Sequence, residues 1–126
     1  MKYIFTIAVL FVHLLCFSQK NSINVVLIAI KAGDATQMAK SFDSNVEISM
    51  PSKSSSYSKS QAELVLRDFF SNYPVKNFES IHKGENAGSE YCIGTLVTKN
   101  GSFRTTIFMK QKADGQVLQE LRFENR

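Results

Sequence analysis

Histidine and cysteine carry much of the catalytic and metal-binding chemistry of proteins, and this sequence holds two of each. His13 and Cys16 fall in an apolar N-terminal run, which leaves His82 and Cys92 for the rest of the chain. No set of cysteines or carboxylates stands at ligand spacing from His82, so we predict no metal centre and no cofactor. Cys92 adjoins no basic cluster that would favour its thiolate, and we interpret it as a small buried hydrophobe.

The first eighteen residues are typical of a secretory signal peptide. A positively charged start precedes an apolar run over residues 4–17, which is shorter than the roughly 20 residues that a membrane-spanning helix needs. Cys16 and Ser18 occupy the −3 and −1 positions of a small-residue cleavage site. Lipid anchoring at Cys16 is the less favoured alternative, because Leu15 stands where lipoprotein signals carry a small residue. We expect cleavage after residue 18, export to the periplasm or the exterior, and no remaining membrane span.

Residues 19–126 are predicted to form a single domain. About 108 residues suffice for one hydrophobic core and leave no room for a second. Fourteen basic residues remain beside 11 acidic ones, and the basic residues are spread singly along the chain. This mild, dispersed positive charge argues against a nucleic-acid-binding surface.

Helical periodicity dominates the first half of this domain. Apolar residues at i, i+3, i+4 and i+7 predict a helix over residues 23–32, which Gly33 ends. Asp34 can then cap a short second helix. The strongest helix spans residues 59–72, because Ser58 can cap it and its apolar residues share one face.

The segments between these helices are rich in turn-forming residues. Residues 43–45, Asp-Ser-Asn, predict a turn that leads into a short strand over residues 46–50. Pro51 stops that strand, since proline cannot donate to a sheet ladder. Six serines among residues 52–60 predict a polar loop.

From Val75 onward the pattern changes to β-strands. Asn100-Gly101 predicts a two-residue type I′ hairpin turn, and residues 113–115 predict a three-residue loop that ends on a glycine. These registers place an apolar set on one face of the sheet: Cys92, Leu96, Phe103, Ile107, Met109, Val117, Leu121 and Phe123. They place a mixed set on the other face: Tyr91, Ile93, Arg104, Phe108 and Arg122.

Two short helices, a strand, a longer helix and a four-stranded antiparallel meander follow one another in this order. The order is similar to that of the nuclear transport factor 2-like fold, in which a curved sheet wraps over helices to form a cone. We therefore expect an α+β fold in which about three helices pack on a curved antiparallel sheet of about five strands.

Short segments spread over the domain extend this likeness. They are KAGD at 31–34, FDSNVEI at 42–48, YSKSQAE at 57–63, FF at 69–70, IHKG at 81–84, YCIGTL at 91–96, FR at 103–104 and QELRF at 119–123. In order and spacing they resemble a family of small exported bacterial proteins, domain of unknown function 4783. The resemblance implies the fold and export, and it supplies no activity and no catalytic residues.

Polar side chains inside the cone would decide between binding and catalysis. The resemblance to the fold implies a cone interior, where enzymes such as ketosteroid isomerases place carboxylates, histidines and tyrosines. Asp68, Tyr73, His82 and Tyr91 are the polar side chains that could reach it. They form no evident acid and base pair, so we predict no catalytic residue. We expect a non-catalytic module that binds a small apolar ligand near Tyr73, His82 and Tyr91, or a protein partner.

The sequence is also compatible with two other functions. One is a small isomerase, hydrolase or dehydratase that acts on an apolar substrate through Tyr73, His82 or Tyr91. The other is a structural homodimer, in which the mixed sheet face packs on its twofold mate. The residues of that interface would be Ile93, Arg104, Phe108 and Arg122.

Overall fold

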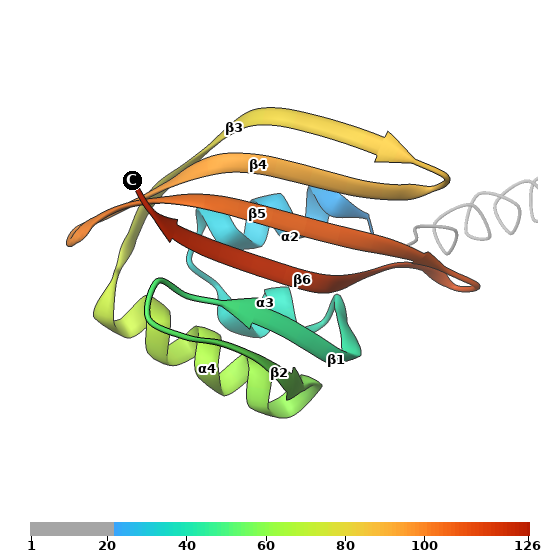
Figure 1. Cartoon of the computed structure of the whole chain (residues 1–126), viewed down its shortest axis with the longest axis horizontal. Helices are drawn as coiled ribbons and strands as arrows, with labels where there is room; N and C mark the ends of the chain where they lie inside the picture. Colours follow the sequence, from blue (N-terminus) through green and yellow to red (C-terminus); the bar gives the residue numbers. More distant parts are fainter. Residues whose placement is uncertain (1–21) are drawn as a thin grey trace, which may run out of the picture.

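Three helices and six strands make up the structure, a computed structural model that describes residues 22–126 (Figure 1). The helices are α2 (Ile23–Lys31), α3 (Ala35–Ala39) and α4 (Lys59–Asn72). The strands are β1 (Phe42–Ser49), β2 (Ser54–Ser58), β3 (Val75–Asn86), β4 (Ser89–Thr98), β5 (Gly101–Lys112) and β6 (Gly115–Asn125). The predicted signal peptide, with Cys16, lies outside the described residues.

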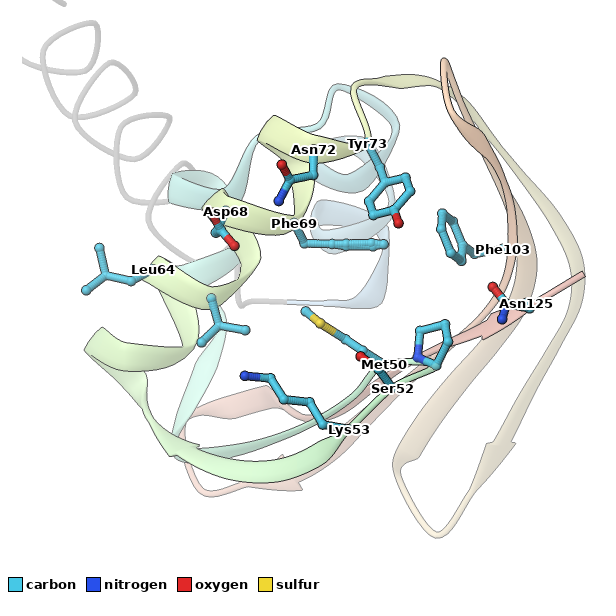
Figure 2. Close-up of a pocket in the computed structure, with 12 residues that line it drawn as sticks. Met50, Ser52, Lys53, Leu64, Asp68, Phe69, Asn72, Tyr73, Phe103 and Asn125 are labelled. Atoms are coloured by element: carbon cyan, nitrogen blue, oxygen red, sulfur yellow. The ribbon is translucent and has the colours of Figure 1, made fainter.

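All six strands form one sheet in the order β2-β1-β6-β5-β4-β3. β1 runs parallel to β6, and the other neighbouring pairs are antiparallel. The sheet curves around the helices, which cover one of its faces (Figure 1 and Figure 2). The predicted packing of three helices on a curved sheet is confirmed, with a sixth strand and one parallel pair as additional details.

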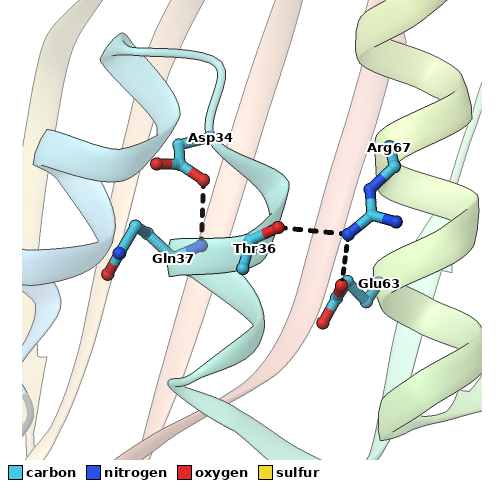
Figure 3. A network of polar contacts seen from close by, with 5 residues as sticks. All are labelled: Asp34, Thr36, Gln37, Glu63 and Arg67. Atoms are coloured by element: carbon cyan, nitrogen blue, oxygen red, sulfur yellow. Dashed lines mark hydrogen bonds and ion pairs between the residues drawn. The ribbon is translucent and has the colours of Figure 1, made fainter.

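Polar contacts join α3 to α4 on the surface of the helical layer. Asp34 caps α3 by accepting a hydrogen bond from the Gln37 amide at 3.1 Å. Arg67 of α4 donates to the Thr36 hydroxyl of α3 at 3.1 Å and also pairs with Glu63 one turn earlier (Figure 3). These groups are solvent-accessible, so each ion pair contributes roughly 1 kcal/mol or less to stability.

Strands β1 and β2 extend into segments that were predicted to be a turn and a loop. Residues 43–45 lie inside β1, because an irregularity between Phe42 and Glu47 in the pairing with β6 absorbs these turn-forming residues. The serine-rich segment forms β2, the short edge strand that pairs antiparallel with β1. Its serines are exposed and show no apolar alternation, so the strand depends on backbone pairing that local sequence does not reveal.

The Asp43 side chain of β1 contacts side chains of β5 and β6. Its carboxylate accepts hydrogen bonds from the Ser44 amide at 2.8 Å and from the Gln119 side-chain amide at 3.1 Å. The Lys112 ammonium lies 3.5 Å away. The Gln119 hydrogen bond, followed by that of Ser44, lowers the pKa of Asp43 below its ordinary value, because each of them stabilises the ionised form.

Replacing this carboxylate should give a pH-dependent loss of stability. A lowered folded-state pKa means that Asp43 stabilises the fold above the unfolded-state pKa, near pH 4, and that this contribution is lost as the pH falls through the folded-state pKa. Asp43→Asn keeps an acceptor oxygen and loses the charge, so we expect about 1 kcal/mol less stability at pH 7. Urea denaturation at pH 7 and at pH 3 measures this, and an equal loss at both values would contradict it.

The β4–β5 hairpin turn is centred on Lys99 and Asn100, and the predicted centre at Asn100-Gly101 is wrong. A type I′ turn requires a positive φ at both central residues, but neither Lys99 nor Asn100 has one. The positive φ of 124° belongs to Gly101, which follows them. The Asn100 side chain donates to the Asn72 carbonyl at 2.8 Å, so a contact with the end of α4 stabilises the shifted turn. The register moves by two residues, which leaves each side chain on its predicted face.

The β5–β6 hairpin has the predicted pairing, but its loop is shorter than predicted and β6 contains a bulge. Its loop holds two residues, Ala113 and Asp114, and the extra residue lies at Gln119, where the register of β6 shifts. Beyond this bulge the predicted pairs of β5 and β6 are confirmed. Between Gly115 and the bulge, the side chains therefore point to the faces opposite to those predicted. Leu118 is buried on the inner face, where Val117 was predicted to lie.

The hydrophobic core lies between the helices and the inner face of the sheet. Apart from Val117, the apolar set predicted for this face is buried in the structure. The predicted helix faces supply the other wall, and its buried residues include Ile23, Val26, Ile30, Met38, Ala62, Leu66, Phe69 and Phe70. This core fixes α4 relative to β5 and β6, which is the geometry that shapes the candidate site.

Candidate functional site

A cavity of about 530 Å³ opens at the mouth of the cone, between α4, the β1–β2 turn and the ends of β5 and β6. We call it the cone cavity. Its apolar lining consists of Met50, Pro51, Leu64, Val65, Phe69, Tyr73 and Phe103 (Figure 2). Its polar lining consists of Ser52, Lys53, Asp68, Asn72 and Asn125. The volume lies within the range of about 300–1,000 Å³ that is usual for small-molecule sites.

An aromatic cluster forms the inner wall of the cone cavity. The Phe69 ring lies 5.0 Å from Tyr73, 5.2 Å from Phe103 and 4.3 Å from Phe123, measured between ring centroids. Tyr73 and Phe103 are 4.9 Å apart, and all four contacts are edge-to-face. Edge-to-face pairs add about 0.5–1.5 kcal/mol each beyond their buried area, so these contacts stabilise the wall.

The opposite wall is the tight turn between β1 and β2. Met50 and Lys53 close it with two backbone hydrogen bonds: the Met50 amide donates to the Lys53 carbonyl at 2.7 Å, and the Lys53 amide donates back at 3.3 Å. Pro51 and Ser52 occupy the middle of the turn, where the fixed φ of proline suits the second position. The turn therefore presents Met50 and Pro51 to the cavity from a hydrogen-bonded backbone.

Charged and amide groups lie toward the solvent side of this cavity. Lys53 comes from the turn and Asp68 from the exposed side of α4, and Asn72 follows one turn after Asp68 (Figure 2). Neither Lys53 nor Asp68 takes part in the ion pairs found among residues 22–126. Both charges are thus available to a polar group on a molecule whose apolar part faces the aromatic wall.

Of the three residues predicted to bind a ligand, only Tyr73 lines the cone cavity. Figure 2 shows its hydroxyl directed toward the space beside Phe103. His82 and Tyr91 lie on the opposite, outer face of the sheet, where His82 Nε2 and the Tyr91 hydroxyl are 3.0 Å apart. The tyrosine ring crosses Gly84, and a Cβ at that glycine would lie 2.3 Å from the ring. Gly84 therefore provides the space that the contact between Tyr91 and His82 needs.

A bulge in β3 determines on which face His82 lies. The pairing of β3 with β4 shifts between Ser80, which is opposite Gly94, and His82, which is opposite Ile93. Ile81 is the extra residue, and it is 63% exposed. Since one additional residue reverses the alternation of a strand, His82 shares the outer face with Ile93 rather than the inner face with Gly94.

The four residues predicted for a sheet interface share the outer face. Ile93 and Phe108 are half-buried, whereas Arg104 and Arg122 are exposed. Arg122 pairs with Glu120 at 2.8 Å and more loosely with Glu124 at 3.8 Å. The face is therefore mixed, as predicted, and whether it contacts another molecule stays a prediction.

Cys92 is fully buried, which confirms its interpretation as a small hydrophobe. Its thiol lies 3.5 Å from the Ser80 hydroxyl. Residues 22–126 contain no group of three histidine, cysteine or acidic side chains that could hold a metal ion. None of the helices in the same range is long and apolar enough to cross a bilayer.

Sequence reasoning missed most of the cavity lining. Met50 and Pro51 were recognised only as a strand end and a strand breaker, and Lys53 only as part of a polar loop. Leu64 is 60% exposed on α4 and lies off the buried stripe of that helix. A large apolar side chain outside the predicted core stripe was the available signal, and it could have marked Leu64 as part of a site.

Structural comparison defines the class of protein to which this cone belongs. An NTF-2 like protein of unknown function from Burkholderia xenovorans LB400 aligns with a TM-score of 0.58 over 82% of this chain and 80% of that chain. The two sequences are 15% identical, so the likeness concerns the fold alone. The chain has a nuclear transport factor 2-like α+β fold.

Its family follows from sequence comparison. The chain belongs to the family described as Domain of unknown function (DUF4783), whose profile matches residues 23–124. A family member from Bacteroides uniformis ATCC 8492 is 30% identical, with a TM-score of 0.80 over 84% of this chain and 98% of that chain. One from Bacteroides ovatus ATCC 8483 is 27% identical, with a TM-score of 0.78 over 81% and 93%. No curated protein matches the chain. The predicted family is thus confirmed.

Proposed function

We propose that this protein is a binding module that takes a small apolar ligand into the cone cavity. The observation that carries the proposal is the lining, in which an aromatic wall faces the Met50-Pro51 turn across about 530 Å³ of space. A ligand that covers these side chains removes apolar surface from water, which contributes roughly 25 cal/mol per Å² before the costs of association. The rings of Phe69, Tyr73 and Phe103 already contact one another edge to face in this wall.

The polar groups of this site favour a ligand with one polar end. Lys53 and Asp68 lie toward solvent, and each can contact a polar group without giving up an ion pair among the described residues. A few placed polar groups fix the orientation of a ligand in sites of this kind. Asp68 and Tyr73 are not accompanied by a histidine in the lining, which favours binding over acid–base catalysis.

Fluorescence titration with N-phenyl-1-naphthylamine tests the proposal. This neutral aromatic amine fluoresces strongly in apolar surroundings and has a size that suits the cavity. We expect saturable binding at one site per chain, and competition by other small apolar molecules. Emission that rises linearly with protein concentration, with no saturation and no competition, would contradict a built site.

We also propose that the domain acts outside the cytoplasm, on the support of the apolar run and cleavage site in residues 1–18. The mass of the protein recovered after expression with its own N-terminus measures this. A chain that begins at Gln19 is expected. A chain that retains Met1, or one that begins with an acylated Cys16, would contradict the predicted processing.

A further inference from the structure

A second hollow, of about 630 Å³, lies on the outer face of the sheet, away from the helices. We call it the outer groove. Its walls include Ile81 and His82 of β3, Ile93 of β4, Arg104 of β5, and Glu124 and Arg126 at the end of the chain. It lies on the face of the sheet that points away from the helices, and Asn125 at the end of β6 lines both the outer groove and the cone cavity.

The charges around the outer groove are not balanced by one another. Arg104 lies directly opposite Glu124 in the β5–β6 pairing, but the described residues give Arg104 no ion pair. Glu124 is instead within 3.8 Å of Arg122, which also pairs with Glu120. The guanidinium of Arg126 contacts the Thr95 hydroxyl rather than a carboxylate. Two guanidinium groups thus line the groove without an acidic partner among residues 22–126.

Aliphatic side chains lie next to these guanidinium groups. The β3 bulge leaves Ile81 63% exposed, and Ile93 is half-buried on the neighbouring strand. An isoleucine this exposed gains little free energy from burial in the folded chain. A ligand that covers it would gain free energy from removing its apolar surface from water.

We propose that the outer groove binds a small organic carboxylate, with the carboxylate between Arg104 and Arg126 and the apolar body against Ile81 and Ile93. Guanidinium groups match a carboxylate through paired, charge-assisted hydrogen bonds. An inorganic anion would satisfy the two arginines and leave the isoleucines exposed, so the adjoining apolar surface favours an anion that carries a hydrocarbon group. This proposal does not depend on a ligand in the cone cavity.

The experiment compares 2-naphthoate with its neutral amide, 2-naphthamide, on the ¹⁵N-labelled protein by NMR. We expect 2-naphthoate to shift amide resonances of Ile93, Thr95 and Arg104, and 2-naphthamide to bind this face at least about tenfold more weakly. Arg104→Gln and Arg126→Gln should each raise the Kd of 2-naphthoate at least about fivefold. Both arginines are exposed, so these variants are expected to fold, and circular dichroism checks this.

The matched control is Arg67→Gln, which removes the same charge from α4 on the other side of the sheet and should leave the Kd unchanged. Equal affinity for the acid and the amide, or an unchanged Kd in both groove variants, would overturn the proposal. Shifts confined to cone-cavity residues would overturn it as well. So would a dimer by light scattering that Arg104→Gln converts to a monomer, because a second copy would then occupy this face.

Discussion

Phe69→Ala is expected to lower the free energy of unfolding by about 3–5 kcal/mol. Phe69 is 4% exposed and its ring contacts those of Tyr73, Phe103 and Phe123, so the truncation removes buried apolar surface and three aromatic contacts. Deletion of a buried ring loses its transfer free energy, adds a cavity term and removes the aromatic pairs. Since small domains are stable by only about 5–15 kcal/mol, this one change should remove much of the stability.

Phe108→Ala is the matched control for this loss. Phe108 lies half-buried on the outer face of the sheet, and the same truncation there should cost about 1 kcal/mol. Urea denaturation of both variants and of the unmodified protein gives the comparison. Losses of similar size in the two variants would show that the Phe69 contacts with Phe103 and Phe123 do not hold α4 against β5 and β6.

Val65→Trp is expected to raise the Kd of N-phenyl-1-naphthylamine at least about thirtyfold, equivalent to about 2 kcal/mol of binding free energy. Val65 lines the cone cavity from α4 and is only partly buried, so a larger side chain can extend into the open space. The indole would occupy the volume that the ligand needs. The change adds no charge and keeps the helix, so the loss of affinity should come from exclusion alone.

The control for this variant is Val25→Trp, the same substitution at a 43% exposed position of α2 that does not line the cavity. Its Kd should equal that of the unmodified protein. If Val65→Trp fails to fold, Leu64→Trp serves in its place, because Leu64 lines the same cavity and is 60% exposed. Unchanged affinity in a folded variant at either cavity position would place the ligand elsewhere.

Local pattern was sufficient to predict the helices and the faces of the meander. Ser58 and Asp34 cap α4 and α3 where their sequence positions indicated, since capping depends on residues within one turn. The faces of β4, of β5 and of the part of β6 beyond its bulge were also predictable, because a hairpin register that is wrong by two residues leaves the alternation intact.

The parallel strand pair, strand β2 and the bulge in β3 depend on long-range contacts, which local sequence does not reveal. The parallel pairing of β1 with β6 joins segments about seventy residues apart, and β2 has exposed serines with no alternating pattern. The bulge at Ile81 moves His82 to the outer face, and no local feature of the segment marks that insertion. Only Tyr73 of the predicted ligand residues therefore lies in the cone cavity, and the turn that forms its other wall was not predicted.

The most direct test of a ligand site in the cone is an NMR titration of the ¹⁵N-labelled protein with N-phenyl-1-naphthylamine. Binding in the cone cavity predicts concentration-dependent shifts of the amides of Lys53, Val65, Asp68, Phe69 and Asn72, with a Kd that agrees with the fluorescence titration. Amides of β3 beyond its bulge should stay unchanged. Shifts that leave the cavity residues unaffected, and that instead follow the outer face of the sheet, would contradict the proposed function.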